Sequence, residues 1–170
     1  MGDSGAPLRI RDAREEDFAA ILRLNEEWVR FTSPLDEASL ARLHAQAARH
    51  RVAEVGGEVV AFLLALREGT DYDSPNYLWF MERGGEPFLY VDRVIVDGAA
   101  QGTGVAGALY DELFAFARKS GVARVVCELD VEPPNEASRR FRDAVGFAEV
   151  GRQWVAGGKK RVSLRELRLG

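Results

Sequence analysis

Apolar and polar residues follow one another along the chain with two different periods, and these periods predict where helices and strands lie. Apolar side chains that recur every three or four positions indicate one face of a helix, whereas short runs rich in β-branched and aromatic residues indicate strands. The expected strands cover 8–11, 51–55, 58–66, 88–96, 124–131, 147–155 and 161–169. The expected helices begin at Glu15, after Pro34, at Gly104 and after Asn135.

The order of these elements predicts an α/β fold. The strand, helix and strand between Phe88 and Val131 are long enough for a parallel crossover. The last two strands, which Gly157-Gly158 separates, are typical of an antiparallel hairpin. We therefore expect a mixed sheet with helices on both faces, in which 8–11 forms an edge strand.

The remaining segments set the expected domain organisation. We expect residues 1–7 to form a flexible N-terminal tail and residues 8–170 to form a single domain. Residues 69–87 are rich in aromatic side chains but show no clear period, so we expect a long irregular segment there. Loops of that length in a compact domain are usually functional or mobile.

Composition narrows the classes of function. The 170 residues carry 23 Lys and Arg against 27 Asp and Glu, a net charge of −4, which disfavours nucleic-acid binding. One cysteine, Cys127, and two histidines, His44 and His50, leave little for a metal site, and we expect none. We expect both histidines on a solvated face in or near the second helix. No apolar stretch approaches the roughly 20 residues of a membrane span, and the first residues lack the apolar region of a secretory signal, so we expect a soluble, cytoplasmic protein.

One stretch carries candidate chemistry. The strand ending Val94-Ile95-Val96 leads through a turn, Gln101-Gly-Thr-Gly104, into an amphipathic helix. The first turn of a helix has free N–H groups and the positive end of the helix dipole, and glycine lets a bulky ligand approach the backbone. This arrangement suits a pyrophosphate. A simple tight turn that packs a helix explains the same residues equally well.

The chain resembles a known family at this point. Gln101-Gly-Thr-Gly104-Val-Ala106 resembles the Gln/Arg-x-x-Gly-x-Gly/Ala signature of the GNAT superfamily of acyl-CoA-dependent N-acetyltransferases, as do the later Asn135-Glu-Ala-Ser138-Arg-Arg-Phe141 and Gly146-Phe147. The resemblance covers nearly the whole chain. It implies a single-domain GNAT-like fold whose sheet splays between strands 4 and 5, with acetyl-CoA as co-substrate in that gap.

The resemblance also implies which residues contact the coenzyme. Backbone groups near the end of the central strand would pair with pantetheine, the amides of the glycine turn would hold the pyrophosphate, and a later helix would contact the coenzyme arm. The residues are Val94, Ile95, Val96, Gln101, Gly102, Thr103, Gly104, Val105, Ala106, Asn135, Ser138 and Phe141. We add Arg142, which departs from the family pattern, as a further candidate for coenzyme binding.

Amine acetylation requires a base, because the attacking amine must be neutral and its ordinary pKa is about 10.4. Asp92, inside an apolar strand and in a register where many family members carry a carboxylate, is the first candidate, and Glu128 on the next strand is the second. A salt bridge, for example between Asp92 and Arg93, or an outward-facing position for Glu128, are the structural alternatives.

The family's usual general acid is a tyrosine directly after Phe141, but here Arg142 stands in its place. Arginine is a poor proton donor, so Tyr90, water or no acid at all would serve the leaving thiolate. Arg142 could instead stabilise that thiolate, bind a coenzyme phosphate or be a solvated helix residue.

The acceptor is expected to bind near aromatic and acidic residues. The resemblance implies that the loop between the first two helices and the segment before the central strand shape the acceptor pocket, so Trp28, Tyr77 and Trp79 are candidates, because aromatic rings and nearby carboxylates can receive an amine. Asn25 is a further candidate, because it lies on an apolar helix face and a buried amide must be hydrogen-bonded. Covering the edge of the core is the alternative role for the aromatic residues, and an ordinary backbone partner is the alternative for Asn25.

The expected function is therefore transfer of an acetyl group from acetyl-CoA to the amine of a small molecule or peptide, with a cationic small molecule favoured by the acidic chain. A catalytically weak acyl-CoA-binding or sensing domain is the alternative, and the missing tyrosine motivates it. Strands near the C-terminus could also pair in a homodimer.

Overall fold

The structure is a computed structural model that describes residues 5–132 and 134–170. The chain divides into two compact units: unit 1 is Met1–Leu66 with Asp92–Ala115, and unit 2 is Arg67–Val91 with Phe116–Gly170. The strands form a mixed sheet with the order β1-β2-β3-β4-β5-β7-β6. The α/β fold class and the edge position of the first strand are therefore confirmed.

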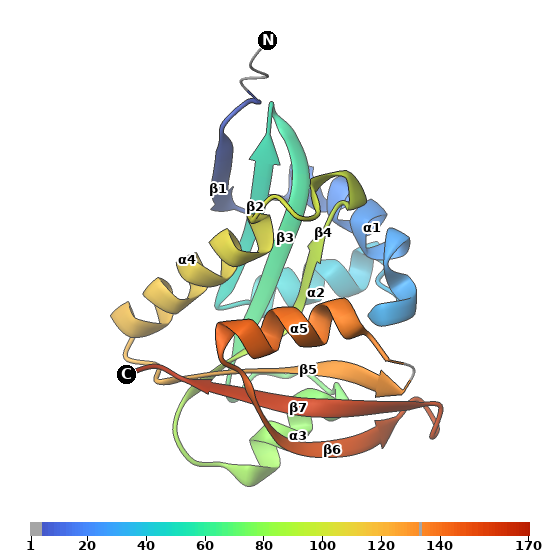
Figure 1. The fold of residues 1–170 in the computed structure, drawn as a ribbon, viewed down its shortest axis with the longest axis vertical. Helices are drawn as coiled ribbons and strands as arrows, with labels where there is room; N and C mark the ends of the chain where they lie inside the picture. The colour runs from blue at the N-terminus through green and yellow to red at the C-terminus, as the bar shows by residue number, and fades with distance from the viewer. Residues whose placement is uncertain (1–4, 133) are drawn as a thin grey trace. The chain divides into compact units, whose positions relative to one another are not determined.

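Unit 1 contains β1 to β3, the helices α1 and α2, the end of β4 and the N-terminal part of α4, and Figure 1 labels these elements. Strands β1 to β3 form an antiparallel meander. The strand β4 and the helix α4 run from one unit into the other. The bounds are β1 (Leu8–Asp12), α1 (Phe18–Glu27), α2 (Glu37–Gln46), β2 (Arg49–Val55), β3 (Glu58–Arg67), β4 (Phe88–Val96) and α4 (Val105–Lys119), with short 3-10 turns at Glu15–Asp17, Val29–Phe31 and Gly98–Ala100.

Helices cover both faces of the meander. Successive side chains of a strand point to opposite faces, so neighbouring residues of β2 contact different helices. On β2, Arg49 and Arg51 reach Glu112 of α4. His50, between them, packs its ring against His44 of α2 and Phe62 of β3. The helices α2 and α4 therefore lie on opposite sides of β2, as the sequence predicted.

Unit 2 combines a short parallel pairing with an antiparallel C-terminal hairpin. Phe88–Tyr90 of β4 pair in parallel with Arg124–Val126 of β5. The last strand, β7, is inserted between β5 and β6 and is antiparallel to both. The bounds are α3 (Pro75–Arg83), β5 (Arg124–Glu132), α5 (Glu136–Val145), β6 (Ala148–Val155) and β7 (Lys160–Arg168).

The expectation that 69–87 is irregular was wrong in part, because the helix α3 occupies its centre. Pro75 stands at the first turn of this helix, where its fixed φ and missing N–H are tolerated. Tyr77 and Phe80 follow three residues apart and are buried, whereas Leu78 is exposed. The period is helical, but only one and a half turns of it carry apolar residues, too few to stand out in the sequence.

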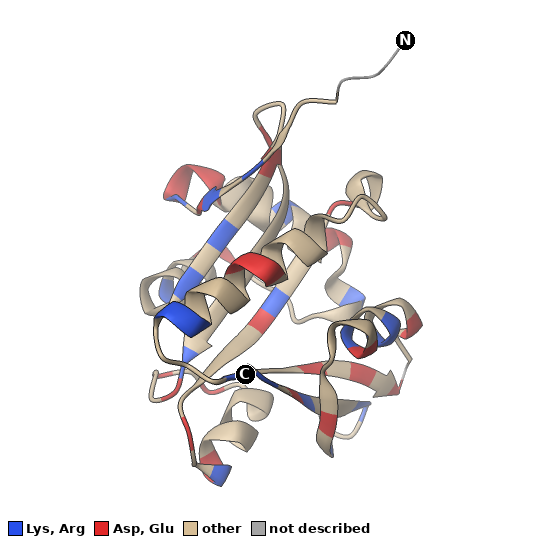
Figure 2. Ribbon diagram, turned by 60° about the vertical axis from the view of Figure 1, so that its left-hand side comes forward, with Lys and Arg blue, Asp and Glu red and all other residues tan. Residues whose placement is uncertain are grey.

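The ends of the other elements follow local signals that the sequence contains. Asn135 caps α5 by accepting the N–H of Ser138, and Gly146 ends it in the left-handed conformation at φ +115°. Charges of both signs are interspersed along the elements (Figure 2). The last turn of α4 carries Arg118 and Lys119, whose positive charges lie at the negative end of the helix dipole.

Residues 1–4 of the expected tail lie outside the described residues, and residues 5–7 belong to no helix or strand. The flexibility of the tail and the extent of the domain stay predictions. Among the described residues, no helix is both long enough and apolar enough to cross a membrane.

Candidate active site

The glycine turn of unit 1 exposes backbone at the start of a helix. Gly102 and Gly104 have φ angles of +78° and +85°, in the left-handed region that favours glycine. A Cβ added at either residue would meet nothing within 4 Å, so space is open beside the backbone. Val105, which is buried, then begins α4. The N–H groups of the first turn of this helix have no acceptor within the helix.

The polar side chains of this turn bond to its own backbone. Asp97 Oδ1 accepts from Ala99 N at 2.9 Å, and Gln101 Nε2 donates to Val96 O at 3.2 Å. The hydroxyl of Thr103 donates to Ala100 O. These bonds fix the shape of the turn without using the amides at the helix start. The free amides at the start of a helix can bind an anion, and the expected pyrophosphate site at this turn stays a prediction.

The last turn of α1 contacts the same segment. Glu27 Oε1 accepts from Gly98 N at 3.1 Å, and the ring of Trp28 lies 4.0 Å from the position of a Cβ on Gly98. Trp28 is half-buried, and its Nε1 is buried with no hydrogen-bond partner among the described residues. Its expected contact with an acceptor stays a prediction. Glu27 was not identified from the sequence, where it is one of two adjacent glutamates at the end of a helix.

Asp92 is buried in β4 and forms an ion pair with its neighbour. Arg93 Nε lies 2.6 Å from Asp92 Oδ2, and both side chains are only 4% exposed. The salt bridge, which the sequence offered as the structural alternative, therefore forms. The ion pair holds the carboxylate in one position, and the expected role of Asp92 as a base stays a prediction.

Arg93 also binds the connection between α1 and α2. Its Nη1 donates to Asn25 Oδ1 at 2.8 Å and to Ser33 O at 3.1 Å, and its Nη2 donates to Ser33 Oγ at 3.0 Å. Asn25 Nδ2 donates to the same Ser33 O at 3.0 Å. Asn25 is 1% exposed, so the buried amide bonds to protein groups, and its expected direct contact with an acceptor has no support from this placement.

In unit 2, Glu128 accepts a hydrogen bond from a buried tyrosine. Tyr90 Oη donates to Glu128 Oε2 at 2.6 Å, and the Tyr90 side chain is 0% exposed. The rings of Tyr77 and Phe80 of α3 pack on Tyr90 with centroid distances of 5.5 and 6.2 Å. Glu128, the second candidate base, therefore lies beside the hydroxyl of Tyr90, which the sequence analysis considered as a proton donor.

The other two expected acceptor residues pack inside unit 2. Tyr77 is 0% exposed, and its hydroxyl donates to Arg67 O at 2.7 Å and accepts from Thr70 N at 2.9 Å. Trp79 is half-buried between Arg83, whose Cζ lies 3.3 Å from the ring centroid, and the backbone of Gly151. Tyr77 holds the position of a core residue, so its expected acceptor contact has no support here, and that of Trp79 stays a prediction.

The helix α5 places Arg142 over β5. Arg142 Nη1 donates to Ser138 Oγ, and the guanidinium lies beside the thiol of Cys127. Burial raises the pKa of that thiol, and the positive charge of Arg142 opposes the rise. Arg142 is half-buried, and its expected roles toward the coenzyme or its thiolate stay predictions. Phe141 is half-buried too, and its expected coenzyme contact stays a prediction, as do those of Asn135 and Ser138.

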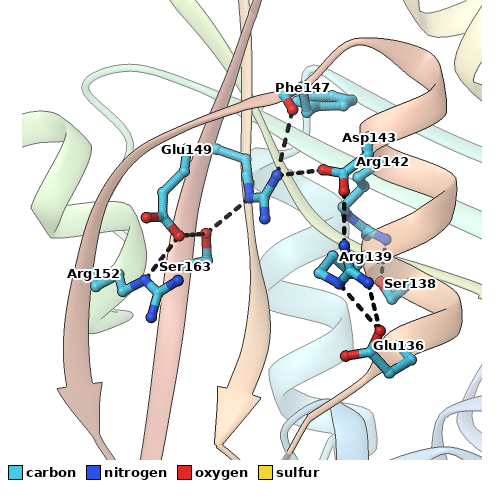
Figure 3. A network of polar contacts seen from close by, with 10 residues as sticks. Glu136, Ser138, Arg139, Arg142, Asp143, Phe147, Glu149, Arg152 and Ser163 are labelled. Carbon is cyan, nitrogen blue, oxygen red and sulfur yellow. Dashed lines mark hydrogen bonds and ion pairs between the residues drawn. The ribbon is translucent and has the colours of Figure 1, made fainter.

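A polar network, which sequence reasoning missed, fixes α5 to the C-terminal hairpin (Figure 3). Arg165 of β7 is 8% exposed and donates to Asp143 Oδ1 at 2.6 Å and to Ser163 Oγ at 2.8 Å. Ser163 Oγ in turn donates to Glu149 Oε2 at 2.5 Å, and Glu149 pairs with Arg152. The network holds the helix that carries Ser138 and Arg142 against the C-terminal hairpin, within unit 2.

The expectation that both histidines lie on a solvated face was wrong for His50. It is 6% exposed in β2, and its Nδ1 lies 2.8 Å from Nδ1 of His44, so one ring donates and the other accepts. Burial first, and the charge of His44 second, lower the pKa of His50 to about 4. Among residues 5–132 and 134–170, no group of three or more His, Cys, Asp or Glu side chains could hold a metal ion.

Structural comparison shows the same fold in known acetyltransferases. Ard1 from Thermoplasma volcanium superposes with a TM-score of 0.77 at 18% identity, covering 96% of this chain and 98% of that one. The ribosomal-protein-S18-alanine N-acetyltransferase from Escherichia coli gives 0.71 at 18%, covering 96% and 95%. YncA, a putative acetyltransferase from Salmonella typhimurium with its cofactor acetyl-CoA, gives 0.70 at 22%, covering 96% and 94%.

Sequence comparison identifies the family. A search of curated proteins found no significant match. A family model for the acetyltransferase (GNAT) family matches residues 10–147, which is most of the chain and includes the glycine turn. The expected family is therefore confirmed, and with it acetyl-CoA as co-substrate. The chain belongs to the GNAT family of acetyltransferases.

Proposed function

We propose that this protein transfers the acetyl group of acetyl-CoA directly to the amine of a small molecule or a peptide. The observation that carries the proposal is the open glycine turn at the start of α4, where Gly102 and Gly104 leave the backbone amides accessible. Residues Gln101 to Ala106 would hold the pyrophosphate through these amides, with Val94, Ile95 and Val96 along the pantetheine. The coenzyme supplies an activated acetyl thioester, so the protein needs to bind, orient and deprotonate the acceptor.

Asp92 would accept the proton of the attacking amine, directly or through one water molecule. An alkyl ammonium has an ordinary pKa of about 10.4, so a base is required near neutral pH. Asp92 is a charged carboxylate held in one place by Arg93, and its burial keeps bulk water away. Glu128 is the second candidate, and in that case Tyr90 Oη would pass or hold the proton at 2.6 Å.

The acceptor would lie against the connection between α1 and α2, which the GNAT resemblance assigns to acceptor binding. Trp28 offers a ring face to a cation and a buried Nε1 that has no partner among the described residues. The chain's net charge of −4 favours a cationic acceptor.

A cytoplasmic location and a homodimer stay predictions.

A binding or sensing domain with weak catalysis is the second candidate. The observation that favours it is Arg142, which stands where the family's usual tyrosine acid would be and donates to Ser138 Oγ. A guanidinium does not give up its proton to a leaving thiolate near neutral pH.

An acceptor screen with detection of free thiol separates these functions. The full chain is incubated with acetyl-CoA and a panel of polyamines, aminoglycosides, amino acid amides and short peptides. We expect thiol release above the hydrolysis rate with at least one cationic amine. Tight binding of the coenzyme in calorimetry with no amine-dependent release would instead support the sensing domain. No heat with CoA would overturn both.

A further inference from the structure

Arg93 joins two parts of unit 1 that the proposed function uses for different purposes. One nitrogen of its guanidinium holds Asp92, the proposed base, at 2.6 Å. The other two hold Ser33, which lies in the connection between α1 and α2, through both its carbonyl and its hydroxyl oxygen. A planar guanidinium with donors in fixed directions is suited to such a bridge.

The bridge is buried and reinforced. Arg93 is 6% exposed, so its charge is removed from water and its bonds are not exchanged freely with solvent. Asn25, 1% exposed, donates to Ser33 O and accepts from Arg93, which closes a ring of hydrogen bonds between α1, the connection and β4. The position of the connection and the position of the Asp92 carboxylate are therefore set by the same side chain.

We propose that Arg93 is a positioning residue that aligns the base Asp92 with the acceptor-binding connection through Ser33. The proposal rests on the proposed function. Ser33 would act on the reaction through Arg93, because its hydroxyl and its carbonyl oxygen both accept hydrogen bonds from Arg93. A displacement of the connection would move the Arg93 guanidinium and with it the Asp92 carboxylate. An acceptor that holds the connection in its bound position would therefore also hold the base in position.

A double-mutant cycle between Ser33 and Asp92 tests this inference. Ser33→Ala removes one bond to the guanidinium at an exposed residue, so the chain should fold. We expect the acceptor kcat/KM to fall roughly tenfold, as for loss of a hydrogen bond to a charged group, while the Kd of CoA changes less than about twofold. In the Asp92→Asn chain, Ser33→Ala should change kcat/KM less than about twofold, because no base remains to be aligned.

The matched control is Ser39→Ala, whose hydroxyl bonds to Arg42 in α2 instead. Arg93→Lys gives a second arm if Asp92→Asn does not fold: it keeps the positive charge but cannot reach all partners, so activity should stay low and Ser33→Ala should have no further effect. Equal effects of Ser33→Ala in both backgrounds, or an effect no larger than that of Ser39→Ala, would overturn the positioning role. A wild-type chain without amine-dependent thiol release would instead overturn the proposed function itself.

Discussion

Arg93 bends back along β4 to pair with Asp92, its neighbour in the chain, at 2.6 Å. Successive side chains of a strand point to opposite faces, so a shorter side chain could not make this contact. The pair places a charged carboxylate at a fixed point of an otherwise apolar strand. Arg93, which holds Asp92 Oδ2, also binds Asn25 and Ser33.

The first prediction concerns Asp92 as the base. Asp92→Asn should lower the rate of amine acetylation at pH 7 by about 10²- to 10⁴-fold, the usual contribution of general base catalysis. The Kd of CoA should stay within about twofold of the wild type. Thiol release and calorimetry measure the two quantities, and Asp111→Asn, an exposed change on α4, is the control. An unchanged rate would remove Asp92 from this role and leave Glu128.

The second prediction concerns the glycine turn. Gly104→Ala places a Cβ on a residue whose φ of +85° disfavours one. The added methyl group also occupies the open space beside the amides. The strain should cost about 1–2 kcal/mol of stability, and the affinity for CoA should fall more than about tenfold. Gly69→Ala, at φ +82° and also in open space, should show the same loss of stability with unchanged CoA affinity. Equal affinity in both variants would contradict a pyrophosphate site at this turn.

The third prediction concerns pH and His50. Its pKa is about 4 in the folded protein and about 6.5 when unfolded, so the unfolded chain binds the proton more strongly. The stabilising effect is complete above pH 6.5 and is lost as the pH falls toward 4, with a total of about 3 kcal/mol. Carboxylates such as Asp17, whose pKa the Arg11 guanidinium lowers, act at still lower pH.

Urea unfolding at pH 7.5 and pH 4.5 measures this loss. The His50→Leu chain should lack most of the difference, and a comparison of the two chains cancels contributions from carboxyl groups such as Asp130, whose pKa burial raises. A wild type and a variant with parallel pH dependence would show that His50 does not titrate in this way.

The fourth prediction concerns the contact between Trp79 and Gly151. A Cβ on Gly151 would lie 2.3 Å from Trp79 Cζ2, so Gly151→Ala should destabilise the protein by about 1–3 kcal/mol. Trp79→Leu in the same chain should recover most of that loss, as measured by thermal unfolding. Gly107→Ala, a helical glycine with nothing within 4 Å, should not destabilise. Failure of Trp79→Leu to recover stability would show that the indole lies elsewhere.

Local signals in the sequence were sufficient for most of the fold. The apolar run from Phe88 to Val96 is bounded as expected, and the cap at Asn135 and the glycine at Gly146 mark the ends of α5 correctly. These features depend only on residues close together in the chain. The helix α3 was missed because too few of its turns carry apolar residues, although Pro75, which is tolerated at the first helical position, was an available signal.

The site was less accessible to sequence reasoning, because its contacts join distant segments. Asp92 and Asn25 were identified as unusual polar residues on apolar elements, but nothing local shows that Arg93 binds both of them, because Asn25 lies 68 residues away from Arg93 in the chain. His50 was missed for the same reason: its partner, His44, belongs to another element. A charged residue within an apolar strand was the available signal for Arg93.

The bond between Glu27 and Gly98 has a consequence for changing the specificity of this protein. Helix α1 carries Asn25, which holds Arg93, and two residues later Glu27, which holds the turn before α4. A rigid helix transmits a shift at one of these residues to the other. If the glycine turn holds the coenzyme as we propose, redesign of the segment after α1 for a new acceptor would therefore also change the affinity for the coenzyme, and the two properties would have to be optimised together.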